Sequence, residues 1–145
     1  MCFICADDVE WEQLDWGDLG WVVRPANVPE AAKLVVLDVK VRPGQGHDFH
    51  RHPNQEEVIL LRSGIVEQWV REDQREMRPG DVAFIPHGAV HATFCASDAA
   101  EPARLFVVLG PSHGPDGYET VDMSTEMPWA SLRELTEPIR SEQGR

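Results

Sequence analysis

The chain is divided into short segments of alternating apolar and polar residues, with turn-forming residues between them. The clearest segment, residues 34–42, reads LVVLDVKVR, so Leu37, Val39 and Val41 fall on one face of an extended strand. Turn signals recur at intervals of roughly 8–12 residues, for example at Pro43-Gly44, Pro53-Asn54, Ser63-Gly64 and Glu72-Asp73. This pattern predicts an all-β fold of roughly eight to ten short strands, arranged as a sandwich or barrel of the jelly-roll kind.

The composition changes after Gly110, where prolines and glycines make an irregular segment. Pro128 then precedes a run of residues suited to one short helix, and Trp129 and Leu132 are expected to pack against the barrel. A length of 145 residues fits one domain. Within it we expect an N-terminal extension over residues 1–32 that packs on the barrel, the barrel itself over 33–110, and a tail with the short helix over 111–145.

The charge balance argues against several classes of partner. The formal net charge is -12, from 25 acidic and 13 basic residues, and no cluster of Lys and Arg is present. Nucleic acid and anionic membranes are therefore not expected as partners. No apolar run approaches the roughly 18 residues of a membrane span, and no secretory signal is visible, so a soluble cytoplasmic protein is expected.

Three cysteines make an odd number, which does not suggest a disulfide framework. Cys2 and Cys5 form a C-x-x-C pair that can be half a zinc site, a redox pair, or simply two reduced thiols. The sequence has no second C-x-x-C, which favours the last interpretation.

The candidate chemistry lies in residues 44–64, which read GQGHDFHRHPNQEEVILLRSG. His50 and His52 are two residues apart, so they project from the same face of a strand. Glu57 follows a turn and can join them, and two imidazoles with a carboxylate can hold a divalent transition metal. Glu56 is the competing carboxylate, but alternation places it on the opposite face from Glu57.

An H-x-H pattern alone is weak, because either histidine can be an exposed strand residue. The pattern gains weight from a second stretch of the sequence, in which short intervals separate Gly80, Pro86, Gly88 and His91. The two stretches resemble the motifs of the cupin superfamily, G-x5-H-x-H-x4-E-x6-G and G-x5-P-x-G-x2-H-x3-N. The chain departs from the second motif at its end, where Cys95 replaces the usual asparagine, and this puts the polarity of the pocket in question.

The resemblance implies a small single-domain cupin with the superfamily's conserved jelly-roll β-barrel. It also implies a metal held by His50, His52, Glu57 and His91, with coordination positions left open for a ligand. Three imidazoles and a carboxylate suit Fe, Mn, Zn, Ni, Co or Cu, and the sequence does not choose among them.

Three functions are compatible with such a site. The first is a metal-dependent enzyme of dioxygenase, isomerase or lyase type, acting on a small carboxylate- or sugar-like molecule chelated to the metal. The second is a non-catalytic cupin that binds a small ligand through its metal. The third is a structural dimer with a vestigial site, and the four filled ligand positions count against it.

His47 is the one candidate catalytic base. Strand alternation places it on the face opposite His50 and His52, so it is either a turn residue or a base at the pocket rim. His87 is expected to be exposed.

The lumen of the barrel is expected to be largely apolar. The residues predicted to line it are Leu37, Val39, Val41, Ile59, Leu61, Val82, Phe84 and Phe106. Val58 and Leu60 lie on the face opposite Glu57, so this apolar outer face needs covering. The resemblance implies that a partner chain covers it, in a homodimer.

Overall fold

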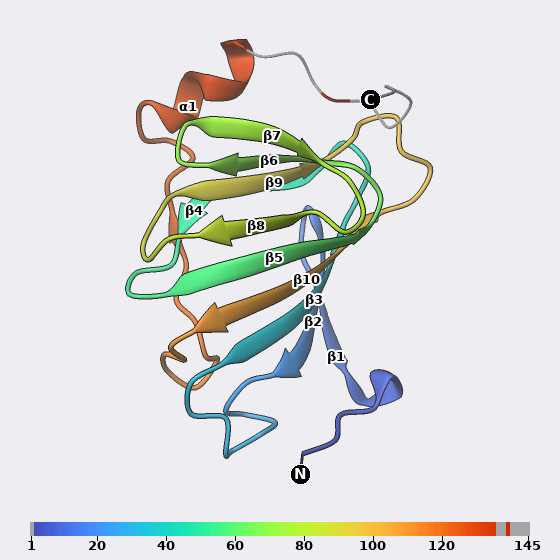
Figure 1. The fold of residues 1–145 in the computed structure, drawn as a ribbon, viewed down its shortest axis with the longest axis vertical. Coiled ribbons are helices and arrows are strands. Elements are labelled where there is room, and N and C mark those ends of the chain that lie inside the picture. The colour runs from blue at the N-terminus through green and yellow to red at the C-terminus, as the bar shows by residue number, and fades with distance from the viewer. Residues whose placement is uncertain (1, 136–138, 140–145) are drawn as a thin grey trace.

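The computed structural model describes residues 2–135 and 139, and it consists of two antiparallel β-sheets with one short helix (Figure 1). The strands are β1 (Glu10–Gln13), β2 (Gly17–Val23), β3 (Val35–Val41), β4 (Gly46–Arg51), β5 (Glu56–Ser63), β6 (Val66–Val70), β7 (Asp73–Met77), β8 (Val82–Ile85), β9 (His91–Cys95), β10 (Ala103–Gly110) and β11 (Val121–Asp122). Helix α1 spans Trp129–Leu132, and 3₁₀ turns lie at Ala6–Asp8 and Arg133–Leu135. The predicted all-β jelly roll with a short C-terminal helix is confirmed.

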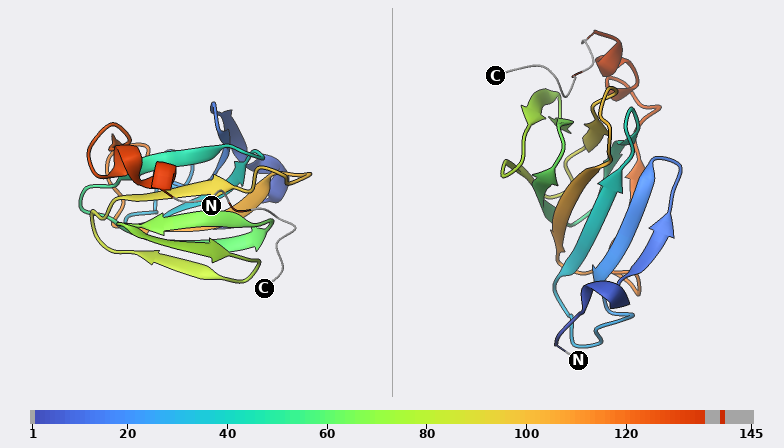
Figure 2. Two further views of the ribbon diagram at one scale, coloured as in Figure 1. Left: turned by 90° about the horizontal axis from the view of Figure 1, so that it is seen from above. Right: turned by 90° about the vertical axis from the view of Figure 1, so that its right-hand side faces the viewer.

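The first sheet has six strands in the order β1-β2-β3-β10-β5-β8. The right-hand view of Figure 2 shows β1, β2, β3 and β10 side by side in one layer. Strand β3 alternates buried and half-buried residues along its whole length, because one of its faces lines the barrel interior. Residues 10–23, within the segment expected as an extension, contribute β1 and β2 directly to this sheet.

The second sheet has five strands in the order β11-β4-β9-β6-β7, and its outer face carries a separate hydrophobic cluster. That cluster consists of Phe49, Trp69, Val90, Ala92 and Phe94. Trp129 and Leu132 of α1 pack against it, as the sequence predicts. The helix therefore covers an apolar sheet face that would otherwise meet water.

An ion pair fixes the end of this helix to the sheet. Arg133 donates from Nε to Oε2 of Glu67, a buried residue of β6, over 2.8 Å, and its guanidinium lies 3.7 Å from the ring centre of Phe94. No helix among the described residues has the length and apolarity needed to cross a membrane.

Three residues predicted to line the lumen lie on the outside instead. Val82 and Phe84 are 57% and 53% exposed, and Phe106 is half-buried on the same outer face. Strand β8 pairs with β5 so that Ile85 is opposite Glu57, which turns Ala83 and Ile85 inward. Because every residue of β8 is apolar, its hydrophobic pattern cannot show which face is inside.

Candidate metal centre

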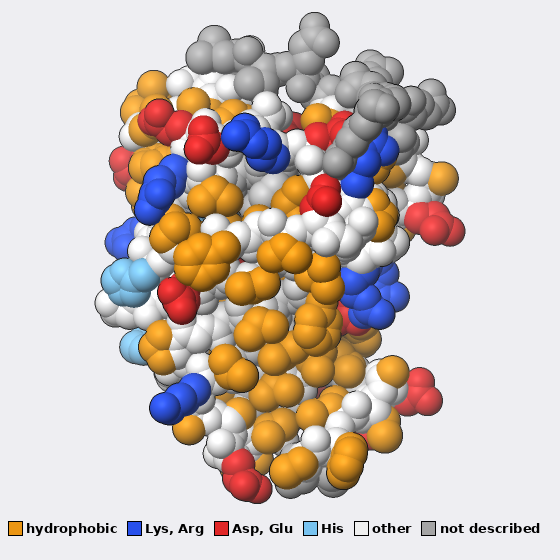
Figure 3. All heavy atoms as spheres, viewed as in Figure 1, with side chains coloured by type: hydrophobic (Ala, Val, Ile, Leu, Met, Phe, Trp, Pro, Cys, Tyr) orange, Lys and Arg blue, Asp and Glu red, His pale blue; other side chains and the backbone are white. Residues whose placement is uncertain are grey.

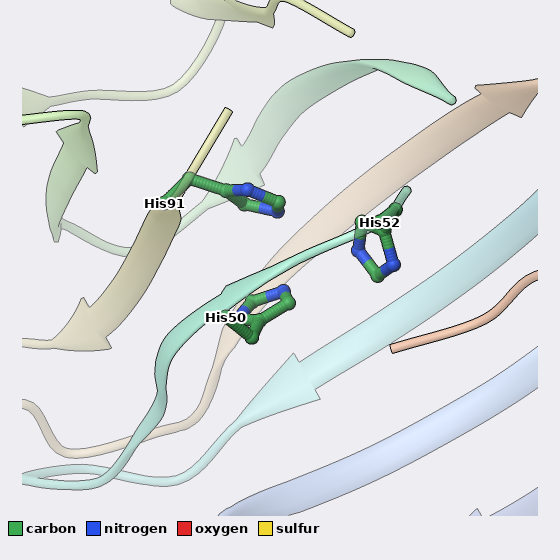
Figure 4. Close-up of side chains that lie close together, drawn as sticks. All are labelled: His50, His52 and His91. Atoms are coloured by element: carbon green, nitrogen blue, oxygen red, sulfur yellow. The ribbon is translucent and has the colours of Figure 1, made fainter. Parts of the chain in front are cut away.

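Three histidines converge inside the barrel from two neighbouring strands. His50 lies in β4, His52 immediately follows that strand, and His91 begins β9. His50 and His91 are partners in the β4–β9 ladder, so their side chains leave the sheet side by side. One ligand nitrogen from each ring lies within 4.8 Å of the others, and all three residues are buried; Figure 4 shows the rings turned toward one another.

The outer nitrogen of each ring is already engaged by the backbone. Nδ1 of His50 lies 2.6 Å from the carbonyl oxygen of Asp48, and Nδ1 of His91 lies 3.0 Å from the carbonyl oxygen of Ala89. Nδ1 of His52 lies 2.9 Å from the carbonyl oxygen of Glu119. A carbonyl only accepts hydrogen bonds, so each Nδ1 carries a proton. Nε2 is then the nitrogen that can bind a cation, in His91 after it loses the proton that it shares with Glu57. This is the tautomer and orientation that metal-binding histidines adopt, so the three residues fit a metal ion.

Glu57 lies beside the histidines on the facing sheet. Its Oε2 atom is 2.7 Å from Nε2 of His91, and its Oε1 atom is 3.7 Å from Nε2 of His52. Glu57 is only 6% exposed, whereas Glu56 is exposed on the outer face of β5. The carboxylate that faces the cluster is therefore the one that strand alternation selects.

His47 lies on the same side as the cluster, contrary to the alternation argument. His47 pairs with Thr93 and His50 pairs with His91, so three residue positions along β4 correspond to two along β9. Strand β4 therefore contains one extra residue between these pairs. Such a β-bulge reverses the alternation of side chains beyond it. The His47 ring consequently stacks between those of Trp16 and His50, with ring centres 4.6 and 3.6 Å apart.

The protonation states of these groups follow from burial and from Glu57. Burial, helped by the neighbouring His91 and His52, lowers the pKa of His47 to about 3. Burial also places the pKa of His50 well below its ordinary value and lowers the pKa of His52. Burial acts in the same direction on His91, but the Glu57 carboxylate outweighs it and raises the pKa of His91.

A C-terminal segment for which the sequence predicts no role in the site completes it. This strap, residues 111–123, supplies the Glu119 carbonyl that orients His52, and its Tyr118 ring lies 5.2 Å from the His52 ring. Buried Gln55 ties the strap down, since its Nε2 donates to the carbonyl oxygens of Pro111 and Gly117 over 2.7 and 3.0 Å. In the sequence, Gln55 is distinguished only by its position between the candidate ligands His52 and Glu57.

The histidines open on a cavity of about 40 Å³ in the barrel. Its lining consists of Trp16, Leu19, Leu37, Val39, Val41, His47, His50, His52, Glu57, Ile59, His91, Thr93, Leu105, Val107 and Tyr118. Trp16, His47 and Tyr118 are the lining residues that keep partial exposure, so they mark where the cavity reaches the surface. Cys95 packs in the hydrophobic core and does not line the cavity, so its replacement of asparagine leaves the cavity lining unaffected.

The remaining candidates lie outside the centre. His87 is exposed, as expected. Cys2 and Cys5 are free and exposed, and Cys95 is free and buried. The described residues contain one group of three or more metal-ligating side chains close enough to hold an ion, and it is the histidine cluster in the barrel.

Together, the barrel and its inward-facing histidines define a class of small β-barrel proteins suited to binding a metal. This chain belongs to the cupin domain family, whose model matches residues 37–109. The match covers β3 to β10 almost completely and includes every histidine of the cluster. No curated protein matches the chain in sequence.

Solved structures with this fold are distant in sequence. KdgF from Halomonas sp. is 19% identical, with a TM-score of 0.65 over 77% of this chain and 95% of its own. An RmlC-like cupin from Shewanella frigidimarina is 15% identical, with a TM-score of 0.65 over 79% and 94% of the two chains. A predicted oxalate decarboxylase from Thermotoga maritima is 13% identical, with a TM-score of 0.66 over 75% and 98%. At these identities the likeness concerns the fold.

Metal binding is expected to release a proton from His91. At about pH 6.5 the raised pKa of His91 keeps more than half of its rings protonated, with Nε2–H facing Glu57, whereas the lowered pKa of His50 leaves its ring neutral. A metal that takes this nitrogen must displace its proton. Calorimetry of metal binding in buffers of different ionisation enthalpy should show net release of protons, declining as the pH rises through the pKa of His91. The Glu57→Gln variant should release less, because it lacks the charge that raises that pKa; a wild-type protein that releases none would contradict this assignment.

Proposed function

We propose that the chain is a metal-dependent enzyme of dioxygenase, isomerase or lyase type, acting on a small carboxylate- or sugar-like molecule chelated to the metal. The observation that carries the proposal is that one ring nitrogen from each of three buried histidines lies within 4.8 Å of the others, while Nδ1 of each ring contacts a backbone carbonyl. In this proposal His50, His52, His91 and Glu57 are the ligands. A bound divalent metal supplies a Lewis acid with open positions for a chelating ligand.

The cavity supports a ligand-binding role rather than a purely structural one. A structural metal site is closed by its protein ligands, whereas these histidines face a cavity that reaches the surface at Trp16, His47 and Tyr118. A domain of this size with its own hydrophobic core also needs no metal to fold. The ligand would lie between the histidines and the opposite sheet.

We assign the role of proton acceptor to His47 within this proposal. Its ring is at the cavity rim, and its pKa of about 3 keeps it neutral throughout the neutral pH range. A base this weak accepts a proton only from a ligand group that is itself made acidic, which is the effect of a Lewis acid on a chelated ligand.

Replacing His47 with alanine is expected to reduce turnover by about 10²-fold or more while leaving metal content unchanged. The measurement is turnover of a panel of small chelating acids, including oxygen consumption, on protein with its metal content determined. The His87→Ala variant is the control, because His87 is exposed and outside the cavity. Full activity of the His47→Ala variant would remove this role, and tight binding without turnover of any panel member would favour the non-catalytic binding protein.

We also propose a homodimer formed through the outer face of the six-stranded sheet. Figure 3 shows hydrophobic side chains gathered over the middle of this face, where β5, β8 and β10 lie. They include Val58, Leu60, Val82, Phe84, Phe106 and Val108. Glu56 and Arg62 are exposed at opposite ends of β5 on this same face, so a two-fold axis between them brings each next to the other residue of the partner.

Replacing Phe84 with aspartate is expected to convert the dimer into monomers at micromolar concentration. Phe84 is 53% exposed in the isolated chain, so the charge costs little there but would be buried in the dimer. Light scattering measures the mass, and Phe3→Asp is the control because Phe3 is 86% exposed outside the sheets. A wild-type protein that is monomeric at the same concentration would refute the dimer.

A further inference from the structure

The cavity has two chemically different walls. The five-stranded sheet contributes His50, Thr93 and His91 from β4 and β9. The six-stranded sheet contributes aliphatic side chains, together with Glu57 at one end. Those aliphatic residues are Leu19, Leu37, Val39, Val41, Ile59, Leu105 and Val107, and all are buried. A ligand held at the histidines therefore has its remaining atoms against hydrocarbon.

The cavity carries few charges. No Lys or Arg stands among the described residues that line it, and Glu57 is its one carboxylate. A divalent cation together with that carboxylate leaves one net positive charge. A ligand with one negative charge neutralises the site, whereas a second negative charge finds no cationic partner and must be buried against aliphatic side chains at a large cost.

The hydroxyl groups in the lining are largely occupied by neighbours. Thr93 donates to the Oε1 atom of buried Gln68 over 2.5 Å. Tyr118 shares a hydrogen bond with Thr120. The His47 ring and the indole N–H of Trp16 remain as polar groups at the rim outside the cluster. The aliphatic wall therefore offers a ligand no donors to pair with several hydroxyl groups, and a polyhydroxylated body would be left with unsatisfied polar atoms.

We infer that the ligand of this site is a small monoanion with a single chelating oxygen head and an apolar body, rather than a dicarboxylate or a sugar acid. The inference rests on the proposed metal centre and narrows its substrate class. The head binds at the histidine cluster, and the body packs against Leu37, Val107 and their aliphatic neighbours.

A pair of matched ligands tests this inference on the wild-type protein loaded with Co²⁺. Malate and 2-hydroxy-4-methylpentanoate share the same 2-hydroxy acid head and differ by a carboxylate in place of an isopropyl group of the same shape. The visible spectrum of Co²⁺ reports metal uptake first and ligand binding second. We expect 2-hydroxy-4-methylpentanoate, or the shorter 2-hydroxybutanoate, to bind at least ~10-fold more tightly than malate.

The outcomes separate this inference from the metal centre on which it rests. If Co²⁺ gives no imidazole-bound spectrum, the proposed centre fails and the ligand class fails with it. If Co²⁺ binds at the histidines but malate binds as tightly as the branched monoanion, the ligand class alone is wrong. If neither monoanion binds to the Co²⁺-loaded protein, the inferred ligand class is also wrong.

Discussion

Replacing His50 with alanine should reduce the bound transition metal of the purified protein from about one equivalent to almost none, with affinity weakened by more than ~100-fold. Loss of a residue that only orients a metal-binding side chain already lowers metal affinity by about 10–100-fold, and loss of the metal-binding side chain itself lowers it further. His50 is in the centre of the cluster, with its ring 4.2 Å from that of His91 and 5.0 Å from that of His52. The His91→Ala variant should behave in the same way.

Elemental analysis and Co²⁺ titration measure this effect, and His87→Ala is the matched control. His87 lies only a few residues before His91 but is exposed and outside the cavity, so its loss should leave metal content unchanged. Equal metal content in wild type and His50→Ala would show that the barrel cluster is not the binding site.

Replacing Gly117 with alanine should both destabilise the protein and weaken metal binding by about 10–100-fold. Gly117 is buried at a φ of +87°, and a Cβ there would collide with Cγ2 of Val35. Its carbonyl accepts from Gln55, so a displacement of Gly117 moves the strap and with it the Glu119 carbonyl that orients His52. A lower melting temperature and a weaker Co²⁺ affinity are therefore expected together.

The control for this variant lies three residues earlier in the same strap. Gly114 also has a positive φ of +67°, but a Cβ there would meet open space. Gly114→Ala therefore carries a similar backbone strain of about 1–2 kcal/mol without the collision. A Gly117→Ala protein that binds Co²⁺ as tightly as Gly114→Ala would show that the strap does not position His52.

The features of the fold and the site that could be predicted from the sequence depend on short-range patterns. The alternation in residues 34–42 correctly placed Leu37, Val39 and Val41 on the buried face, because that strand has polar residues on the other side. The two-residue spacing of His50 and His52, with the second stretch ending at His91, indicated three imidazoles that the structure brings within 4.8 Å.

The features that the sequence did not reveal arise from irregular strands and from long-range contacts. One extra residue in β4 moved His47 onto the face of His50, and no sequence signal marks that bulge. Strand β8 is apolar throughout, so its sequence does not show which residues face inward. The prediction that Val82 and Phe84 line the lumen was therefore wrong. The role of Glu119 involves a backbone carbonyl 67 positions from His52, a contact to which its side chain contributes nothing.

We expect a divalent metal to lie between the ring nitrogens of His50, His52 and His91. The most direct measurement is a crystal structure of the Co²⁺- or Zn²⁺-loaded protein, with anomalous diffraction data collected at the absorption edge of that metal. One strong anomalous peak is expected at about 2.0–2.2 Å from all three Nε2 atoms, with Glu57 as the carboxylate ligand. An empty barrel, or a peak only at the exposed thiols of Cys2 and Cys5, would contradict it.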